Sequence, residues 1–262
     1  MEADFVMKHL LLTTIAAVLV VGCGESIPIS IYEAAQNGNI EVLKRHLVNG
    51  VNVNEKGPFN ASPLHIAVYN DHKEAAELLI SKGADINSKG GGESYTPLMV
   101  AASNKRNDIA RMLILNGANI NATAKDGTSA LVVASQLNNI KLVKLLVSNN
   151  ANIDCADKIG ITPLHSATMN NNKDIVEFLV ANKAAVNSKS KEGLHTPLFF
   201  ASQKGYDKIT KLLILNGAEV NLKDKRGNTP LDIAIFKKHP KTADLLRKHG
   251  GKTGEELKAK GK

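Results

Sequence analysis

Residues 162–187 read TPLHSATMNNNKDIVEFLVANKAAVN, and variants of this stretch recur along the chain at a fixed spacing. The leucine that follows the proline marks each copy, at Leu64, Leu98, Leu131, Leu164, Leu198 and Leu231, and an imperfect first copy has Ile31 at this place. Successive copies lie 33 or 34 residues apart. Self-similarity at this period predicts a stack of small units that bury their apolar faces against one another, and not a globule built around a catalytic cleft.

Each copy opens with residues that favour the start of a helix. A threonine or serine stands at the expected N-cap, and in five copies a proline follows it, as in Thr162-Pro163. The hydroxyl can accept a hydrogen bond from a free backbone amide, and proline is tolerated at the first helical position because its missing N–H costs nothing there. The first copy has Ser30 and Glu33, which fit a capping box. Ser129 keeps the cap without the proline, so we expect a weaker helix start there.

A second amphipathic helix is predicted in every copy. Apolar residues such as Leu142, Val143 and Leu146 recur at helical spacing, and a glycine or asparagine usually closes the segment, as Gly117 does. Polar, turn-rich stretches connect the copies. Two of these stretches, around residues 90–93 and 189–193, carry one extra residue.

These motifs resemble ankyrin repeats, whose hallmark is Thr-Pro-Leu-His-x-Ala at a period of about 33 residues. The resemblance covers residues 30–250, which hold seven units. It implies an all-α repeat solenoid, in which helix–turn–helix units with projecting β-turn fingers form a curved, elongated stack. It also implies a noncatalytic role, in which the protein binds a partner protein.

The resemblance further implies a candidate partner-binding surface, because ankyrin proteins generally bind through their finger tips and the inner face of the first helices. The corresponding helix residues here are Gln36, Tyr69, Asn70, Ser103, Asn104, Gln136, Met169, Gln203 and Phe236. These positions vary between copies while the packing positions stay alike. A surface that binds one irregularly shaped partner would show this contrast. Neutral drift at exposed positions would produce the same contrast. The large side chains Tyr69, Met169 and Phe236 are the expected anchors.

The formal net charge is +8, and much of the excess lies in the fingers. The finger residues that we include in the candidate surface are Lys125, Lys158 and Lys225. Such a row can attract an anionic partner. It can also serve only to keep the fingers soluble, and aspartates interleaved with the lysines favour this second interpretation. Nucleic acid is not expected as a partner, because an exported protein with few aromatic residues offers little for bases to stack on.

No catalytic, metal-binding or cofactor-binding constellation is predicted. His65 and His165 share a Leu-His-x-Ala context but lie three units apart, about 30 Å at ~10 Å per helix layer, so they cannot share a metal ion. The resemblance implies that both support loop hydrogen bonds. His195 and His239 are isolated in the sequence and are expected to be exposed, and Cys155 is expected to be a surface thiol.

The N-terminal segment predicts an export signal. Residues 10–21 form a run of apolar residues and threonines that is too short for an ordinary membrane span of roughly 20 residues. The ending Val20-Val21-Gly22-Cys23 resembles a bacterial lipoprotein signal, in which the cysteine is lipidated. The alternatives are an ordinary signal peptide and a short anchor with an incidental cysteine. The segment before Met7 is acidic where positive charge is expected, so Met7 is an alternative start.

These observations predict four parts: a signal peptide (1–22), a short tether (23–29), the repeat array (30–250) and a charged tail (251–262) that is expected to fray. We predict a monomeric scaffold that is anchored by lipid to a membrane of the bacterial cell envelope. A soluble periplasmic or secreted protein is the alternative address. The alternative functions are a regulatory or inhibitory subunit of an enzyme, an electrostatic binder of an anionic partner, and a structural role in the envelope.

Overall fold

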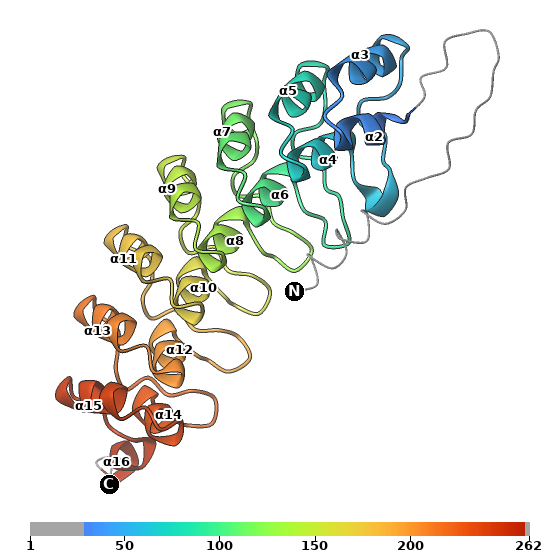
Figure 1. The fold of residues 1–262 in the computed structure, drawn as a ribbon. Coiled ribbons are helices and arrows are strands. Elements are labelled where there is room, and N and C mark those ends of the chain that lie inside the picture. The colour runs from blue at the N-terminus through green and yellow to red at the C-terminus, as the bar shows by residue number, and fades with distance from the viewer. Residues whose placement is uncertain (1–28, 260–262) are drawn as a thin grey trace. The chain divides into compact units, whose positions relative to one another are not determined.

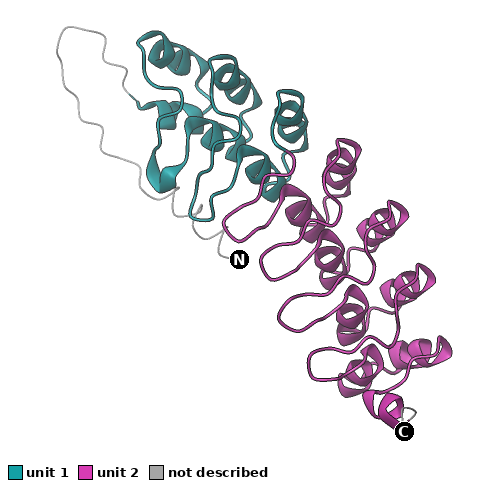
Figure 2. Ribbon diagram, turned by 180° about the vertical axis from the view of Figure 1, so that it is seen from behind, with its two compact units in different colours: residues 1–119 teal, residues 120–262 magenta. Residues whose placement is uncertain are grey.

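A computed structural model describes residues 29–259 of the 262-residue chain. The chain divides into two compact units, residues up to 119 and residues from 120 onward, which Figure 2 colours teal and magenta. Within the described range the regular structure is helical, apart from two isolated β-bridges that join Gly90 to Tyr95 and Thr123 to Ser129. No helix in this range has the length and apolar character needed to cross a membrane.

The first unit holds three helix pairs and one short 3-10 segment. The pairs are α2 (Ile31–Gln36) with α3 (Ile40–Val48), α4 (Pro63–Tyr69) with α5 (Lys73–Ser81), and α6 (Pro97–Ser103) with α7 (Asn107–Leu115). The 3-10 segment η2 (Pro58–Asn60) lies in the finger that precedes α4.

The second unit holds four helix pairs and a short final helix. The pairs are α8 (Ala130–Gln136) with α9 (Ile140–Ser148), α10 (Pro163–Met169) with α11 (Lys173–Ala181), α12 (Pro197–Lys204) with α13 (Asp207–Leu215), and α14 (Pro230–Phe236) with α15 (Pro240–Lys248). The chain then forms α16 (Gly254–Ala259). Within this unit the first helices of the pairs pack in one row and the second helices in another, and the finger loops project from the row of first helices (Figure 1).

The predicted helix starts are confirmed. Thr96 Oγ1 accepts a hydrogen bond from the amide of Met99 at the start of α6. Ser30 and Glu33 form the expected capping box at the start of α2. Ser129, which lacks the following proline, still accepts from the amide of Val132 at 3.3 Å, so α8 begins at the same place in its repeat as the other first helices.

Small residues let neighbouring helices approach closely. Ala34, Ala101 and Ala134 lie in the first helices α2, α6 and α8 and have no exposed surface. The leucines that mark the repeats, such as Leu64 and Leu164, are also fully buried. The core of each unit is therefore a row of apolar layers between helices, as expected for stacked repeats.

An asparagine ladder, made of Asn54, Asn121, Asn187 and Asn221, links successive repeats. Asn187 Nδ2 donates to the carbonyl oxygen of Gly217 at 3.0 Å, while its Oδ1 accepts from the amide of Glu219 at 2.9 Å. Asn54, Asn121 and Asn221 make the same pair of bonds. Asp154 takes this place in one repeat, where it accepts from the amide of Ala185 and, as a carboxylate, has no donor for the second bond.

The expectation that the tail frays is wrong for residues 254–259, which form α16. Thr229 Oγ1 donates to the carbonyl of Lys252 at 2.7 Å, and the amide of Gly254 donates to the Asp232 carboxylate at 2.8 Å. Arg247 Nη1 also pairs with Glu256 at 2.6 Å. These polar contacts attach the tail to α14 and α15, whereas composition alone indicated a solvated segment.

Candidate functional site: a groove in the second unit

The aspartates in the fingers of the second unit stabilise the turns of these fingers by accepting backbone hydrogen bonds. Asp157 Oδ1 accepts from the amides of Ile159 and Ile161, at 3.0 and 2.8 Å. Asp126 and Asp224 accept from amides of their own turns in the same way. The finger aspartates are therefore engaged with backbone donors.

The neighbouring lysines stay exposed. Lys125, Lys158 and Lys225 are exposed, and within residues 29–259 their ammonium groups have no ion-pair or hydrogen-bond partner. The backbones of successive fingers are linked, since the amide of Lys158 donates to the carbonyl of Asp126 at 2.8 Å and that of Lys225 to the carbonyl of Gly193 at 3.0 Å. The fingers of the second unit, which we call its finger row, are therefore joined by backbone hydrogen bonds and carry exposed lysine ammonium groups.

The longer finger, residues 189–195, places a histidine against aromatic rings. The amide of His195 donates to Ser190 Oγ at 3.1 Å, and the amide of Ser190 donates to the carbonyl of His195 at 2.9 Å. This closed turn stacks the His195 imidazole on Phe199, with ring centroids 4.3 Å apart and planes 9° apart. Phe200 makes a T-shaped contact with the same imidazole, with ring centroids 5.4 Å apart. The expectation that His195 is an isolated, exposed histidine is therefore wrong, because its ring packs against two phenylalanines of α12 and is only partly exposed.

A buried carboxylate lies behind His195. Asp224 is 9% exposed, and its Oδ1 accepts from the amides of Arg226 and Asn228 while its Oδ2 accepts from the Asn228 side-chain amide at 3.0 Å. His195 Nε2 lies 3.9 Å from Asp224 Oδ2. Burial lowers the pKa of His195; the nearby Asp224 carboxylate acts in the opposite direction, and Arg226 acts in the same direction as burial.

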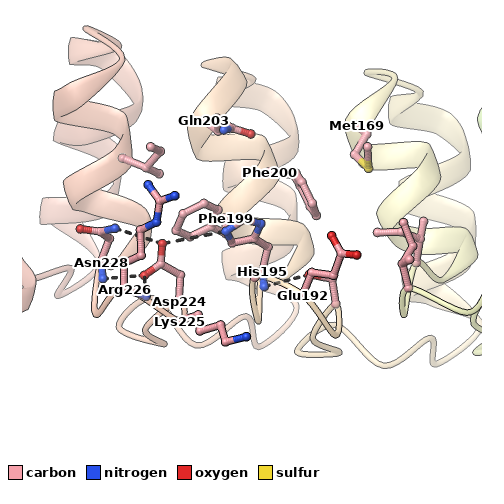
Figure 3. Close-up of a pocket in the computed structure, with 15 residues that line it drawn as sticks. Met169, Glu192, His195, Phe199, Phe200, Gln203, Asp224, Lys225, Arg226 and Asn228 are labelled. Carbon is pink, nitrogen blue, oxygen red and sulfur yellow. Dashed lines mark hydrogen bonds and ion pairs between the residues drawn. The ribbon is translucent and has the colours of Figure 1, made fainter.

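These residues border a groove of about 660 Å³ within the second unit, shown in Figure 3. Its apolar lining comes from three first helices and a finger, through Ile159, Met169, Phe200 and Ile233. Its polar lining comes from the finger tips and one helix end, through Glu192, His195, Gln203, Lys225, Arg226 and Asn228. A partly apolar concavity of this volume with a few convergent polar groups is the usual form of a binding site.

The groove brings together three of the residues predicted from the sequence: Met169, Gln203 and Lys225. Met169 is the last residue of α10, Gln203 lies near the end of α12, and Lys225 lies in the finger before α14. Lys125 and Lys158 lie in fingers of the same unit but do not line the groove.

The other predicted helix residues do not line this groove. They occupy the last position of their first helices, at Gln36, Tyr69, Ser103, Gln136 and Phe236. Phe236 is 74% exposed, and the ammonium of Lys237 lies over its ring at 5.4 Å. Asn70 and Asn104 have a local role, because each donates its side-chain amide to the carbonyl four residues earlier and caps its own helix. Cys23 lies outside the described residues.

Several groove residues were not predicted from the sequence. Phe200 and Ile233 occupy the third residue after the proline in their repeats, a position that is buried in α4, α6, α8 and α10. The signal that could have found them is the appearance of a phenylalanine where earlier repeats have Ile66 and Val100. His195 stands at the repeat place of Tyr95 and Ile161, and its carbonyl closes the finger turn as theirs do, but its ring contacts with Phe199 and Phe200 had no counterpart in the sequence pattern.

His65 and His165 have the expected structural role. In His165, Nδ1 accepts from the amide and hydroxyl of Thr162, and Nε2 lies 3.1 Å from the carbonyl oxygen of His195. His65 makes the equivalent contacts to Ser62 and to the carbonyl of Tyr95. Burial lowers the pKa of each to about 4, so both are neutral at pH 7.

Two further expectations about reactive side chains are wrong. Cys155 is partly buried, with its Sγ 2.9 Å from Ser129 Oγ, and burial raises the pKa of its thiol. His239 is also partly buried and contacts the carbonyl of Gln203 through Nε2 at 3.1 Å. Both contacts recur in the first unit, between Ser62 Oγ and Ser88 Oγ and between His72 Nε2 and the Gln36 carbonyl oxygen, so the repeat period is the signal that could have indicated them. Within residues 29–259 no group of three or more His, Cys, Asp or Glu residues could hold a metal ion.

Comparisons with known proteins agree with this architecture. The family model described as Ankyrin repeats (3 copies) matches residues 31–124, 113–190 and 183–256. The crystal structure of the human ASB11 ankyrin repeat domain aligns with a TM-score of 0.73 at 27% identity, covering 83% of this chain and 97% of that one.

Three curated relatives match shorter stretches. A putative ankyrin repeat protein of Rickettsia felis is 43% identical over 61 residues, which are 22% of this chain and 20% of that protein. An ankyrin repeat-containing protein of Schizosaccharomyces pombe is 33% identical over 58 residues, 22% of this chain and 28% of its own. Alpha-latrocrustotoxin-Lt1a of Latrodectus tredecimguttatus is 36% identical over 61 residues, 23% of this chain and 4% of the toxin. The matched stretch spans less than a third of each relative. The chain therefore belongs to the ankyrin-repeat family, an all-helical solenoid fold that is typically noncatalytic and generally binds protein partners.

Proposed function

We propose that this protein is a noncatalytic scaffold that binds a partner protein through the groove and finger row of its second unit. The observation that carries the proposal is the groove itself, where Met169, Gln203 and Lys225 converge from three repeats. Exposed apolar side chains beside charged finger tips are the combination that protein interfaces use, with an apolar centre and a polar rim.

The groove also contains a serine, a histidine and an aspartate, which raises the alternative of nucleophilic catalysis. In a catalytic triad the nucleophile is hydrogen-bonded to the imidazole. Here Ser190 Oγ accepts from the backbone amide of His195, and the imidazole ring lies flat against Phe199. Asp224 is occupied by the amides of its own turn. This arrangement favours a structural role for the three residues and a noncatalytic function for the groove.

A photo-crosslinking experiment tests the proposed function. A photoreactive amino acid is introduced at Gln203, on the groove, and at Ser103, which occupies the same place of the repeat in the first unit and ends α6. After irradiation in the native cell, we expect a discrete crosslinked adduct from position 203 and little from position 103. Equal adducts from both positions, or adducts from position 103 alone, would remove the groove from the proposed function.

We also propose that the protein is exported and anchored by a lipid on Cys23 to a membrane of the bacterial cell envelope. The support is the sequence ending Val20-Val21-Gly22-Cys23 after an apolar run, which lies outside the described residues. Metabolic labelling with a fatty-acid analogue should label the wild type and not Cys23→Ser, and the variant should be released or accumulate as a precursor. Membrane retention of an unlabelled wild-type protein would contradict the anchor.

A further inference from the structure

The two units differ in charge, and this difference bears on the partner. Residues 120–262 contain 23 Lys and Arg against 13 Asp and Glu, whereas residues 1–119 contain 10 against 12. The positive charge of the chain therefore belongs to the unit that holds the groove. A field of one sign around a concave site raises the local concentration of ligands of the opposite sign.

At the groove the basic side chains are free to pair with a ligand, whereas one of the two acidic side chains is already hydrogen-bonded within the protein. Lys225 and Arg226 are exposed, and within the described residues neither side chain forms an ion pair or hydrogen bond. Of the two acidic side chains that line the groove, Asp224 is buried and accepts from three donors of its own finger. Glu192 is exposed, so one carboxylate faces two cations at this rim.

The apolar side of the groove is unusually exposed. Ile159 is 49% exposed at a finger-tip position where the neighbouring fingers of the unit carry Asp126, Gly193 and Arg226. Met169 is 37% exposed across the same groove. Packing within the unit does not account for an exposed isoleucine at a finger tip, and an apolar ligand group that covers it would remove both side chains from water.

Amide groups complete the lining. The side chains of Gln203 and Asn228 border the groove, and Gln203 has no hydrogen-bond partner for its side chain within residues 29–259. A carboxamide offers both a donor and an acceptor, which matches the backbone of an extended peptide. Bases of a nucleic acid would need an open aromatic face, and the face of Phe199 is already covered by His195.

We propose that the groove of the second unit binds an extended acidic peptide segment of the partner protein, with an apolar side chain packed against Ile159 and Met169 and carboxylates paired with Lys225 and Arg226. This inference rests on the proposed function and specifies the chemistry of its ligand. Carboxylates on both sides of an apolar residue would satisfy the basic rim and the exposed apolar pair together.

A random peptide library displayed on phage, selected against the full chain, tests the inference. We expect the enriched peptides to combine Asp or Glu with at least one large apolar residue. Enriched peptides that are basic, or that lack acidic residues, overturn the inference. If a polyglutamate peptide, a deoxythymidine oligonucleotide or phosphatidylglycerol vesicles bind as tightly as the selected peptides, the site is a general polyanion surface and the inference also fails.

Matched variants locate the binding. Ile159→Ser with Met169→Ser should weaken the selected peptides at least tenfold, since truncated interface anchors commonly cost that much. Phe59→Ser is the control, because Phe59 is also 49% exposed at the equivalent finger position of the first unit, and it should change affinity less than about twofold. Arg226→Glu should weaken binding about tenfold and flatten its dependence on salt. Thermal melts confirm that each variant folds.

The outcomes separate this inference from the proposed function. If the groove variants abolish the crosslink to the native partner but leave acidic-peptide binding unchanged, the proposed function stands and the inference fails. If the groove variants leave the native crosslink unchanged, the groove is not the partner site, and both proposals fail. Loss of both signals in the groove variants, with the Phe59 control intact, supports both.

Discussion

The first and second units repeat the same helix pair but present different surfaces. In the first unit, the inner positions Ile66 and Val100 are buried, and the helix ends beside them are closed by the side-chain amides of Asn70 and Asn104. In the second unit the equivalent positions in α12 and α14, Phe200 and Ile233, are partly exposed and line a groove. The surrounding residues are also basic in the second unit and slightly acidic in the first.

This contrast shows that the repeat specifies the stacked core, while the side chains on the surface of each repeat can differ between the two units. Stacking uses the leucines and alanines of every repeat in the same way, so a substitution on the inner face changes little of the core. The groove of the second unit is lined by Phe200 and Ile233 and by Glu192 and His195 of a longer finger, although the first unit also has a longer finger, around residues 90–93. The predictions below test which features the two units share and which are special to the second.

The largest expected effect is acid destabilisation, which should affect both units because each holds one buried neutral histidine. Burial lowers the pKa of His65 and of His165 to about 4 in the folded state, while the unfolded chain titrates near 6.5. Between these values only the unfolded state takes up the proton, so stability falls as the pH falls from about 6.5 to about 4. The loss should reach about 3 kcal/mol for each histidine.

Urea unfolding at pH 7 and pH 5 measures the part of this loss that develops by pH 5, which should be about 2 kcal/mol for each histidine. His165→Met follows the residue found at the same place in α6, Met99, and should reduce the acid loss of the second unit only. Asp232 occupies this place in α14, so that repeat serves as an internal control without a histidine. An unchanged acid loss in a variant that lacks both histidines would show that other groups are responsible.

The second expected effect is overpacking, which should be alike in the two units. Ala101 in α6 and Ala134 in α8 are both fully buried between helices. Replacement of either by leucine inserts volume between packed helices and should cost roughly 1–3 kcal/mol. The measurement is the urea midpoint, with Tyr69→Ala as a control at a partly exposed position. A cost from Tyr69→Ala equal to that of the alanine replacements would show that we have assigned the faces wrongly.

The third prediction concerns the asparagine ladder. Asp154 in the second unit accepts one hydrogen bond but cannot donate to the carbonyl at the position equivalent to Gly83, which Asn54 reaches at 3.1 Å in the first unit. Asp154→Asn should supply the missing donor and raise stability by about 1 kcal/mol. The reciprocal change, Asn54→Asp, should lower stability by a similar amount. Chemical denaturation checks both, and a gain in both variants would refute the ladder argument.

The smallest expected effect lies in the backbone of the longer finger. Leu194 has φ of 56°, in the left-handed region, where Gly127, Gly160 and Gly227 stand in the other fingers of the second unit. Leu194→Gly removes a steric cost of about 1–2 kcal/mol but adds unfolded-state entropy of up to about 1 kcal/mol. A net gain of about 0.5 kcal/mol is therefore expected in the unfolding midpoint. Gly127→Ala should be destabilising, because its new Cβ would lie 2.9 Å from the backbone nitrogen of Lys158.

Much of the fold followed from local patterns, and much of the site did not. The helix starts at Ser30, Thr96 and Ser129 and the buried leucines follow from short-range capping and periodicity, and the structure confirms them. Met169 and Gln203 were predicted as surface residues from their place in the repeat, and they line the groove. His195 was misjudged because its burial comes from contacts of its ring with Phe199, Phe200 and Asp224, which the repeat pattern does not specify.

The sequence by itself determined the repeat period, the helix pairs, the core layers and the family. These features depend on contacts within a repeat or between neighbouring repeats, and such contacts leave a periodic trace in the chain. Only the tertiary structure decided how the irregular parts meet. It placed the stacked pair of His195 and Phe199 beside the basic rim of Arg226, and it attached the tail to Asp232. Those contacts join residues that share no period, so their geometry depends on side-chain packing in three dimensions.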